Sequence, residues 1–306
     1  MSKDDKPRKP ATRLVTVGRA KHLTGPFVNP PVVRASTVLF PTAEDMQHLR
    51  QRYAYGRRGT PTSEALETAV SELEGADGTV IAPSGLAAAS VALLSCLSAG
   101  DEVLITDSVY GPVRHFADDM LRRFGITVTY YDPLVGAGIA DAFTERTRAV
   151  YAESPGSVTF EMQDLPAIAA VAHTRGATVI FDNTWATPYF FRALDFGADI
   201  SVIAGTKYFV GHSDAMLGTI SARGEAWHRL KHTHGTLGQF TGPDDMFLAL
   251  RGIRTMGIRL EQHQRSALAL ASWLEGRPEV DRVLYPALPS DPGHALWRRD
   301  MRGARG

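Results

Sequence analysis

The feature that most constrains the fold is an alternation of two patterns between residues 63 and 220. Short runs of β-branched residues there alternate with apolar residues at helical spacing. Parallel strands must be joined by crossover connections, so this alternation is typical of a sheet with helices on its faces. The sequence therefore predicts an α/β fold with a mainly parallel seven-stranded sheet flanked by helices. Strands are expected near residues 79–82, 102–106, 126–130, 149–152, 178–181, 200–203 and 215–220.

The segments on either side of this block differ from it. Residues 1–60 are rich in Pro and Arg and lack periodicity, which predicts an N-terminal arm, with a disordered polar start over residues 1–13. Residues 61–255 form the predicted large domain. Apolar residues at helical spacing over 246–275, followed by an expected short strand at 283–285, predict that residues 256–306 open a C-terminal small domain. Too few residues follow to complete that domain, so we expect it to be incomplete.

Composition narrows the class of partner. The 306 residues carry a formal net charge of zero, which favours neither nucleic acid nor a membrane surface. No apolar stretch reaches the length of a membrane span, and no histidine spacing is typical of a metal site, so we predict no membrane and no metal. The single cysteine, Cys96, lies in an apolar run and is interpreted as a buried structural thiol. A reducing, cytoplasmic location and a small-molecule partner are expected.

The central candidate for chemistry is Lys207, which follows the strand expected at 200–203. A lysine at the carboxyl end of a strand points into the crevice where open α/β sheets bind ligands. Its amine can there form a Schiff base with an aldehyde cofactor. Most lysines in loops are solvated charges, so this residue alone is a weak signal.

Three further features strengthen that hypothesis. Asp182, at the end of the strand expected at 178–181, can pair with a protonated ring nitrogen, although a turn-capping Asp is the common alternative. Ser84, Gly85 and Leu86 lie between a strand and a helix, where backbone N–H groups can hold a phosphate, although Ser84 can equally be an ordinary N-cap. Tyr110 can stack on an aromatic ring, although a lone loop Tyr is usually only half-buried packing.

At these residues the chain resembles a known family. Two segments, Phe181-Asp182-Asn183-Thr184-Trp185-Ala186-Thr187-Pro188 and Gly205-Thr206-Lys207-Tyr208-Phe209-Val210-Gly211-His212-Ser213-Asp214, resemble the Cys/Met-metabolism enzymes of the aspartate-aminotransferase fold, which use pyridoxal 5'-phosphate (PLP). The likeness continues at residues 53–62, 84–86, 153–157 and 251–255. It therefore covers the chain from about residue 30 to the end.

The resemblance implies a role for each matching residue. Lys207 would bind the cofactor covalently and later move protons, with Tyr110 as a second proton donor that also stacks on the ring. Asp182 would pair with the ring nitrogen. The phosphate would be held by Thr206, Ser84, Gly85 and Leu86, and by Tyr55 and Arg57 reaching across from a neighbouring subunit. That last role implies a homo-oligomer, a dimer of dimers, to which the arm contributes.

The chain departs from the family pattern at two places. Ala204 stands where many members have a serine that donates to the phosphate, so one contact of about 1 kcal/mol is expected to be missing. Family members also continue beyond the length of this chain, in a segment that carries the arginine for the substrate carboxylate. No residue is assigned to that role from the sequence, and a catalytically inactive, truncated member is therefore one alternative.

The reaction is indicated by the segment that begins at Glu153. Its Pro155-Gly156-Ser157 resembles the β-lyases, whereas γ-acting enzymes commonly have Ser-Asn-Pro here. The resemblance implies α,β-elimination that cleaves the carbon–sulfur bond of L-cystathionine to homocysteine, pyruvate and ammonia, a step of methionine biosynthesis. A γ-lyase or γ-synthase activity is the alternative. A nucleotide-binding module is disfavoured, because the chain has neither a P-loop nor a dinucleotide glycine fingerprint.

Overall fold

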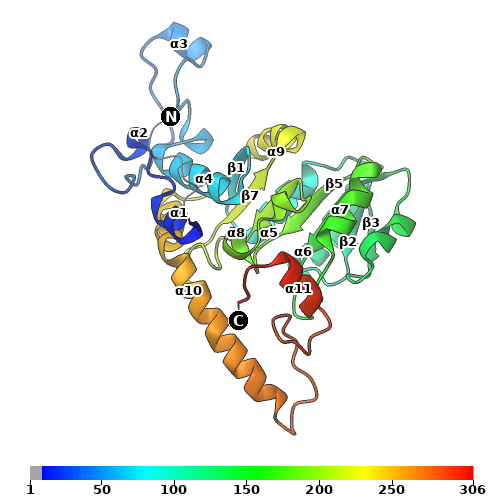
Figure 1. Cartoon of the computed structure of the whole chain (residues 1–306). Helices are drawn as coiled ribbons and strands as arrows, with labels where there is room; N and C mark the ends of the chain where they lie inside the picture. Colours follow the sequence, from blue (N-terminus) through cyan, green and yellow to red (C-terminus); the bar gives the residue numbers. More distant parts are fainter. Residues whose placement is uncertain (1–8, 306) are drawn as a thin grey trace, which may run out of the picture.

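The fold is built on one seven-stranded sheet, seen in a computed structural model that describes residues 9–305 (Figure 1). The strands lie in the order β1-β7-β6-β5-β4-β2-β3. Only β7 runs antiparallel to its neighbours, β1 and β6, so the sheet is mainly parallel. The strands are β1 (Gly78–Ala82), β2 (Glu102–Thr106), β3 (Thr127–Tyr131), β4 (Thr147–Glu153), β5 (Thr178–Asp182), β6 (Ile200–Ile203) and β7 (Gly218–Ala222). The predicted fold class and strand count are confirmed.

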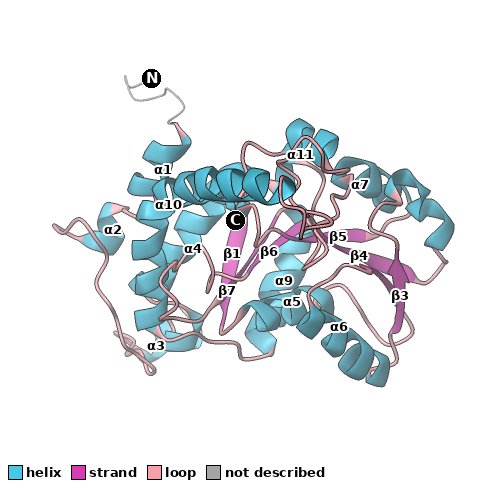
Figure 2. Cartoon of the chain, turned by 90° about the horizontal axis from the view of Figure 1, so that it is seen from below, coloured by secondary structure: helices cyan, strands magenta, loops and turns pink. Residues whose placement is uncertain are grey.

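Helices cover both faces of the sheet (Figure 2). Neighbouring strand residues point to opposite faces, so Leu104 of β2 packs in one buried cluster while Val103 and Ile105 pack in the other. The first cluster lies against α4 (Pro61–Glu74), α7 (Leu165–Thr174), α8 (Thr187–Phe190) and α10 (Pro243–Glu275). The second lies against α5 (Gly85–Leu94), α6 (Gly111–Phe116) and α9 (Gly224–Thr236).

Local sequence sets the bounds of α4, the helix that opens the large block. Thr60 and Ser63 form a reciprocal capping box, and Pro61 occupies the first helical position. Gly75 ends the helix in the left-handed conformation that glycine adopts without strain. The helix therefore begins and ends at residues whose chemistry specifies both ends.

The arm is partly helical. It contains α1 (Pro10–Thr16), α2 (Lys21–Thr24) and α3 (Ala43–Gln47). The expected disorder is wrong for residues 10–13, because Leu14 and the neighbouring Val17 are buried against α10 and anchor this segment. The expected disorder of residues 1–8 falls outside the described residues.

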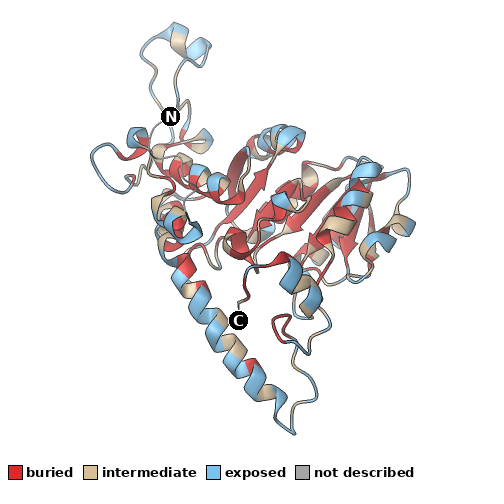
Figure 3. Cartoon of the chain, in the orientation of Figure 1, coloured by how far each residue is buried: buried red, intermediate tan, exposed pale blue. Residues whose placement is uncertain are grey.

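The last part of the chain runs along α10 and then returns to the sheet (Figure 1). The first half of α10 carries most of its buried side chains, such as Ile253 and Met256, whereas most residues after Leu260 are exposed, including Trp273 (Figure 3). The strand expected at 283–285 is wrong, because those residues form an extended loop without a strand partner among residues 9–305. After it come α11 (His294–Asp300) and a tail whose Arg302 N–H donates to the Phe190 carbonyl oxygen. No helix in the described part of the chain has the length and apolar character needed to cross a bilayer.

Candidate active site

The loops that follow the parallel strands surround a cavity of about 440 Å³. This is the edge of the sheet at which open α/β folds bind ligands. Seven of the nine residues singled out from the sequence line this cavity: Ser84, Gly85, Leu86, Tyr110, Asp182, Thr206 and Lys207. The structure therefore brings together residues that are up to 123 positions apart, from Ser84 to Lys207.

Lys207 lies in a tight turn just after β6. Its backbone N–H donates to the Ala204 carbonyl oxygen at 2.9 Å, and its own carbonyl accepts from the Gly211 N–H at 2.7 Å. The turn is anchored on the core side by Phe209 and Val210, which are buried. The backbone is therefore fixed while the side chain of Lys207 stays exposed at the cavity wall.

Asp182 is the last residue of β5, and both of its carboxylate oxygens have donors. Oδ1 accepts from the Thr184 N–H at 2.9 Å, and Oδ2 accepts from the Tyr151 hydroxyl at 3.3 Å. Burial raises the pKa of Asp182, and the hydrogen bonds from Thr184 and Tyr151 act in the opposite direction. The carboxylate is thus held in one orientation, and a cation brought to it would favour its charged form.

The turn before α5 packs closely against the turn that carries Lys207, with Gly85 next to Ala204. Ser84 caps α5, because its side-chain oxygen accepts from the Ala87 N–H at 3.1 Å. The alternative role of Ser84 as an ordinary N-cap is therefore also correct. A Cβ added to Gly85 would lie 2.5 Å from the Cβ of Ala204. Only glycine fits there, and Ser84, Gly85 and Leu86 at the start of α5 line the cavity.

Thr206 lines the cavity, but its hydroxyl is already engaged. Its Oγ1 donates to the Leu217 carbonyl oxygen at 3.1 Å and accepts from the Leu217 N–H at 3.1 Å. The hydroxyl proton is therefore used inside the protein, and only the remaining lone pair of Oγ1 faces other partners.

Tyr110 is positioned by a carboxyl group that the sequence did not single out. Its backbone N–H donates to Oε2 of Glu153 at 2.8 Å, and Tyr110 itself is 46% exposed and lines the cavity. Glu153 ends β4 and pairs in register with Asp182 of β5. Burial, and then the Asp182 charge, raise the pKa of Glu153 well above its ordinary value. Adjacent strand ends in a parallel sheet were the signal that could have identified this residue.

Arg305 is the second residue that sequence reasoning missed. Its guanidinium carbon lies 4.2 Å from the centroid of the Tyr208 ring and 5.8 Å from that of Trp185, and the side chain lines the cavity. Its Nε is buried and has no acceptor among residues 9–305. Burial lowers the pKa of Arg305 to about 10. No local sequence pattern identifies Arg305 as a site residue, because it lies 98 positions after Lys207.

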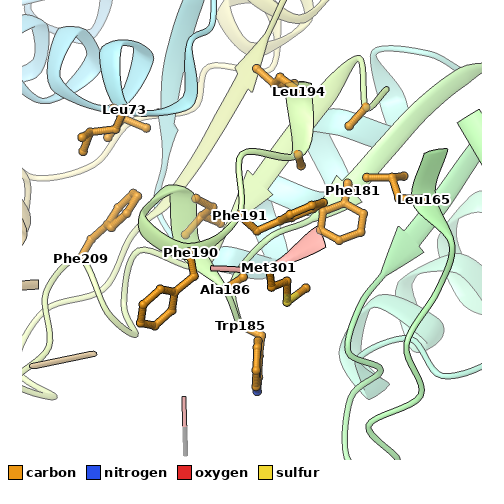
Figure 4. Packing of buried hydrophobic residues seen from close by; sticks show 14 of the residues in the cluster. Leu73, Leu165, Phe181, Trp185, Ala186, Phe190, Phe191, Leu194, Phe209 and Met301 are labelled. Atoms are coloured by element: carbon orange, nitrogen blue, oxygen red, sulfur yellow. The ribbon is translucent and has the colours of Figure 1, made fainter. Parts of the chain in front are cut away.

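Aromatic packing supports the wall that carries Asp182 and Trp185. Phe181 and Phe191 lie with ring centroids 5.4 Å apart, and Phe191 also contacts Phe196. Figure 4 shows Met301 beside this cluster, near Trp185 and Phe190. The C-terminal segment therefore reaches the cavity over a packed apolar base.

The remaining two predicted residues lie elsewhere. Tyr55 is 45% exposed, and Arg57 donates from Nη1 to the Gly235 carbonyl oxygen at 3.0 Å. Neither lines the cavity of their own chain. Within residues 9–305 no three His, Cys, Asp or Glu side chains are grouped so that they could hold a metal ion.

The cavity has the donor set that PLP requires. An amine suits its aldehyde, a fixed carboxylate suits its ring nitrogen, and an exposed tyrosine ring suits its pyridine face. The open N-terminus of α5, cradled where Gly85 approaches Ala204, suits its phosphate. The residues present therefore fit this cofactor.

Comparison with known proteins agrees with this geometry. A protein of Rhizobium johnstonii, provisionally named cystathionine beta-lyase, is 57% identical over 96% of this chain and 74% of its own length. Cystathionine beta-lyase MetC of Escherichia coli is 42% identical over 96% of this chain and 76% of its own length. The crystal structure of metB from Corynebacterium glutamicum matches with a TM-score of 0.93 at 29% identity, covering 98% of this chain and 77% of that one. A family model described as Cys/Met metabolism PLP-dependent enzyme matches residues 11–306, and this chain belongs to that family.

Proposed function

We propose that this chain is a carbon–sulfur lyase that converts L-cystathionine and water to homocysteine, pyruvate and ammonia. The observation that carries the proposal is the single cavity in which Lys207, Asp182 and Tyr110 meet. The names of the relatives at 57% and 42% identity support the same activity. The Pro155-Gly156-Ser157 segment, which also borders the cavity, favours elimination at the β carbon over the γ carbon.

Bound PLP supplies an electron sink that stabilises negative charge at the substrate α carbon. Lys207 serves as the base for the α proton, because its amine is the mobile basic group on the cavity wall. The same proton is passed to the sulfur as the β carbon–sulfur bond breaks, from Lys207 or through the Tyr110 hydroxyl. Homocysteine leaves, and water hydrolyses the three-carbon fragment to pyruvate and ammonia.

In this proposal Asp182 is negatively charged and Glu153 is neutral, and the two carboxyl groups therefore have different roles. Asp182 is held by two donors and keeps the ring nitrogen protonated. Burial and the Asp182 charge raise the pKa of Glu153, which within residues 9–305 accepts only the Tyr110 N–H, so we propose that Glu153 is the member of the pair that takes a proton. A neutral Glu153 leaves Asp182 as the single negative charge opposite the ring.

Arg305 binds the carboxylate of the amino-acid substrate. Its guanidinium carbon lies 4.2 Å from the centroid of the Tyr208 ring, its Nε has no acceptor in the described chain, and it shares the cavity with Lys207. A guanidinium pairs with a carboxylate through two parallel hydrogen bonds. This assignment fills the role for which the sequence offered no residue.

Tyr55 and Arg57 serve the cavity of a second copy of the chain. Tyr55 is 45% exposed, and neither residue lines the cavity of its own chain, which supports this role. It requires a homo-oligomer, for which we propose a dimer of dimers. In this proposal residues 1–60 are the exchanged arm, residues 61–255 hold the cofactor, and residues 256–306 belong to a small domain, with α10 spanning the junction. The one cysteine, Cys96, supports a reducing, cytoplasmic setting.

The test is to incubate the PLP-loaded chain with L-cystathionine and assay the products. Equal amounts of pyruvate and homocysteine support β-elimination. Cysteine with 2-oxobutyrate indicates cleavage on the γ side instead. Bound cofactor with neither set of products supports the inactive alternative and overturns the proposal.

A further inference from the structure

A second cavity, of about 270 Å³, lies where the arm meets the first half of α10. Arg251 and Arg254 lie three residues apart and so face the same side of the helix. Arg19, from the connection between α1 and α2, completes a group of three guanidinium groups. No Asp or Glu is among the described residues that line it.

The hydrogen bonds of Arg254 explain only part of this arrangement. Its Nη1 donates to the carbonyl oxygens of Leu14, Val15 and Val17, at 3.2, 3.1 and 2.6 Å, and so holds the C-terminal end of α1. Its Nε and Nη2 are buried without an acceptor in the described chain. A purely structural role therefore uses one nitrogen and leaves two nitrogens, with three N–H groups, unsatisfied.

Arg19 adds a further buried donor and a second positive charge beside that of Arg254. Its Nε is also buried without an acceptor within residues 9–305. Burial, and then the charge of Arg19, lower the pKa of Arg254 to about 10, so the two cations raise each other's free energy. Buried donors and unpaired like charges are normally compensated, here by a group that carries negative charge and several acceptors.

The cavity walls specify the class of occupant. Asn29 adds an amide beside the cations, while Phe247 and Leu250 form an apolar wall. Guanidinium groups match the oxygens of phosphate and sulfate in paired geometry. We propose that this cavity binds a phosphate- or sulfate-type oxyanion, which fastens the arm to α10. The site is separate from the PLP cavity and does not rest on the proposed lyase activity.

The experiment uses PLP-loaded protein, so that the cofactor's own phosphate site is filled. Inorganic sulfate is titrated by isothermal calorimetry in phosphate-free buffer, with sodium chloride at matched ionic strength as the reference. We expect saturable sulfate binding and a thermal midpoint that rises as the site fills. Sulfate also stabilises proteins without binding, so saturation must be tested together with variants.

Arg251→Gln and Arg19→Gln remove one charge each without touching the carbonyl contacts of Arg254. Each is expected to weaken sulfate binding about tenfold or more. Arg282→Gln, at an exposed arginine beyond α10, is the matched control and should bind as the wild type does. Absence of saturable binding, or equal affinities in all three variants, overturns the proposal. Loss of the oligomer in Arg251→Gln without any sulfate binding also overturns it, since a second copy would then be the occupant.

Discussion

The PLP cavity and the arm differ in what fixes the positions of their polar side chains. Asp182 and Glu153 stand at the ends of adjacent paired strands, so the sheet fixes their positions. Tyr55 and Arg57 lie on an arm whose described part contributes few residues to the core. A sheet-built site is organised within one chain, whereas under the proposed function the arm residues gain their role from a second copy of the chain. Substitutions in the two regions should therefore fail in different ways.

Lys207→Ala tests the sheet-built site most severely. In the role proposed for Lys207, its loss removes both the covalent anchor and the base, so pyruvate formation should fall by about a thousandfold or more. The Schiff-base absorption of the bound cofactor should disappear. Lys231→Ala, at an exposed position of α9, is the matched control and should keep both. An unchanged absorption band in Lys207→Ala would show that another amine holds the cofactor.

Asp182→Asn should have the next largest effect. The amide keeps the shape of the carboxylate but cannot hold the ring nitrogen protonated, and we expect kcat to fall about a hundredfold, roughly 3 kcal/mol of barrier. Glu153→Gln is the informative partner, because a protonated carboxyl and an amide are both neutral. It should cost less than tenfold. Equal losses in the two variants would contradict the division of charge between them.

Arg305→Gln tests the proposed carboxylate contact through the split between KM and kcat. Removing a charge-assisted pair is expected to raise KM about tenfold with a smaller change in kcat. Arg305→Lys should recover part of the loss, since it keeps the charge. Cofactor absorbance serves as the control for an intact cavity. A fall in kcat with unchanged KM would exclude substrate binding as the role of this residue.

Sequence reasoning succeeded where local chemistry and position coincide. Lys207, Asp182 and the Ser84–Leu86 turn each follow a strand, so the sheet pattern alone places them at one edge. Arg305 could not be found this way, because its position depends on how α10, α11 and the tail return to Phe190. The expected strand at 283–285 failed for a related reason. A short apolar run becomes a strand only where a partner edge is available.

Arg57→Gln addresses the arm, with a smaller expected effect on each site. Losing one phosphate contact should weaken cofactor affinity about tenfold. Mixing Arg57→Gln with Lys207→Ala subunits gives a sharper test. At a cofactor concentration that leaves Arg57→Gln sites largely empty, random pairing should restore up to about a quarter of wild-type activity, because half the dimers are mixed and each holds one intact site. If activity stays at the sum of the separate variants, the arm does not serve a neighbouring cavity.

The smallest effect is expected where the arm is fastened to α4. Glu64 accepts from Arg52 Nε at 2.8 Å and from the Tyr53 hydroxyl at 2.7 Å, and hydrogen bonds from Arg52 lower the pKa of Glu64 to about 2. A carboxyl whose pKa is depressed on folding stabilises the protein above its unfolded value of 4.5 and loses that contribution as pH falls toward 2. Solvent screening limits the contribution to about 1 kcal/mol. Glu64→Gln should therefore increase proteolysis of the arm at pH 7 but leave it unchanged near pH 2, while Glu44→Gln, on exposed α3, should change neither. Equal protection of the arm in wild type and Glu64→Gln at pH 7 would show that apolar contacts of α1 with α10, rather than this cluster, hold the arm in place.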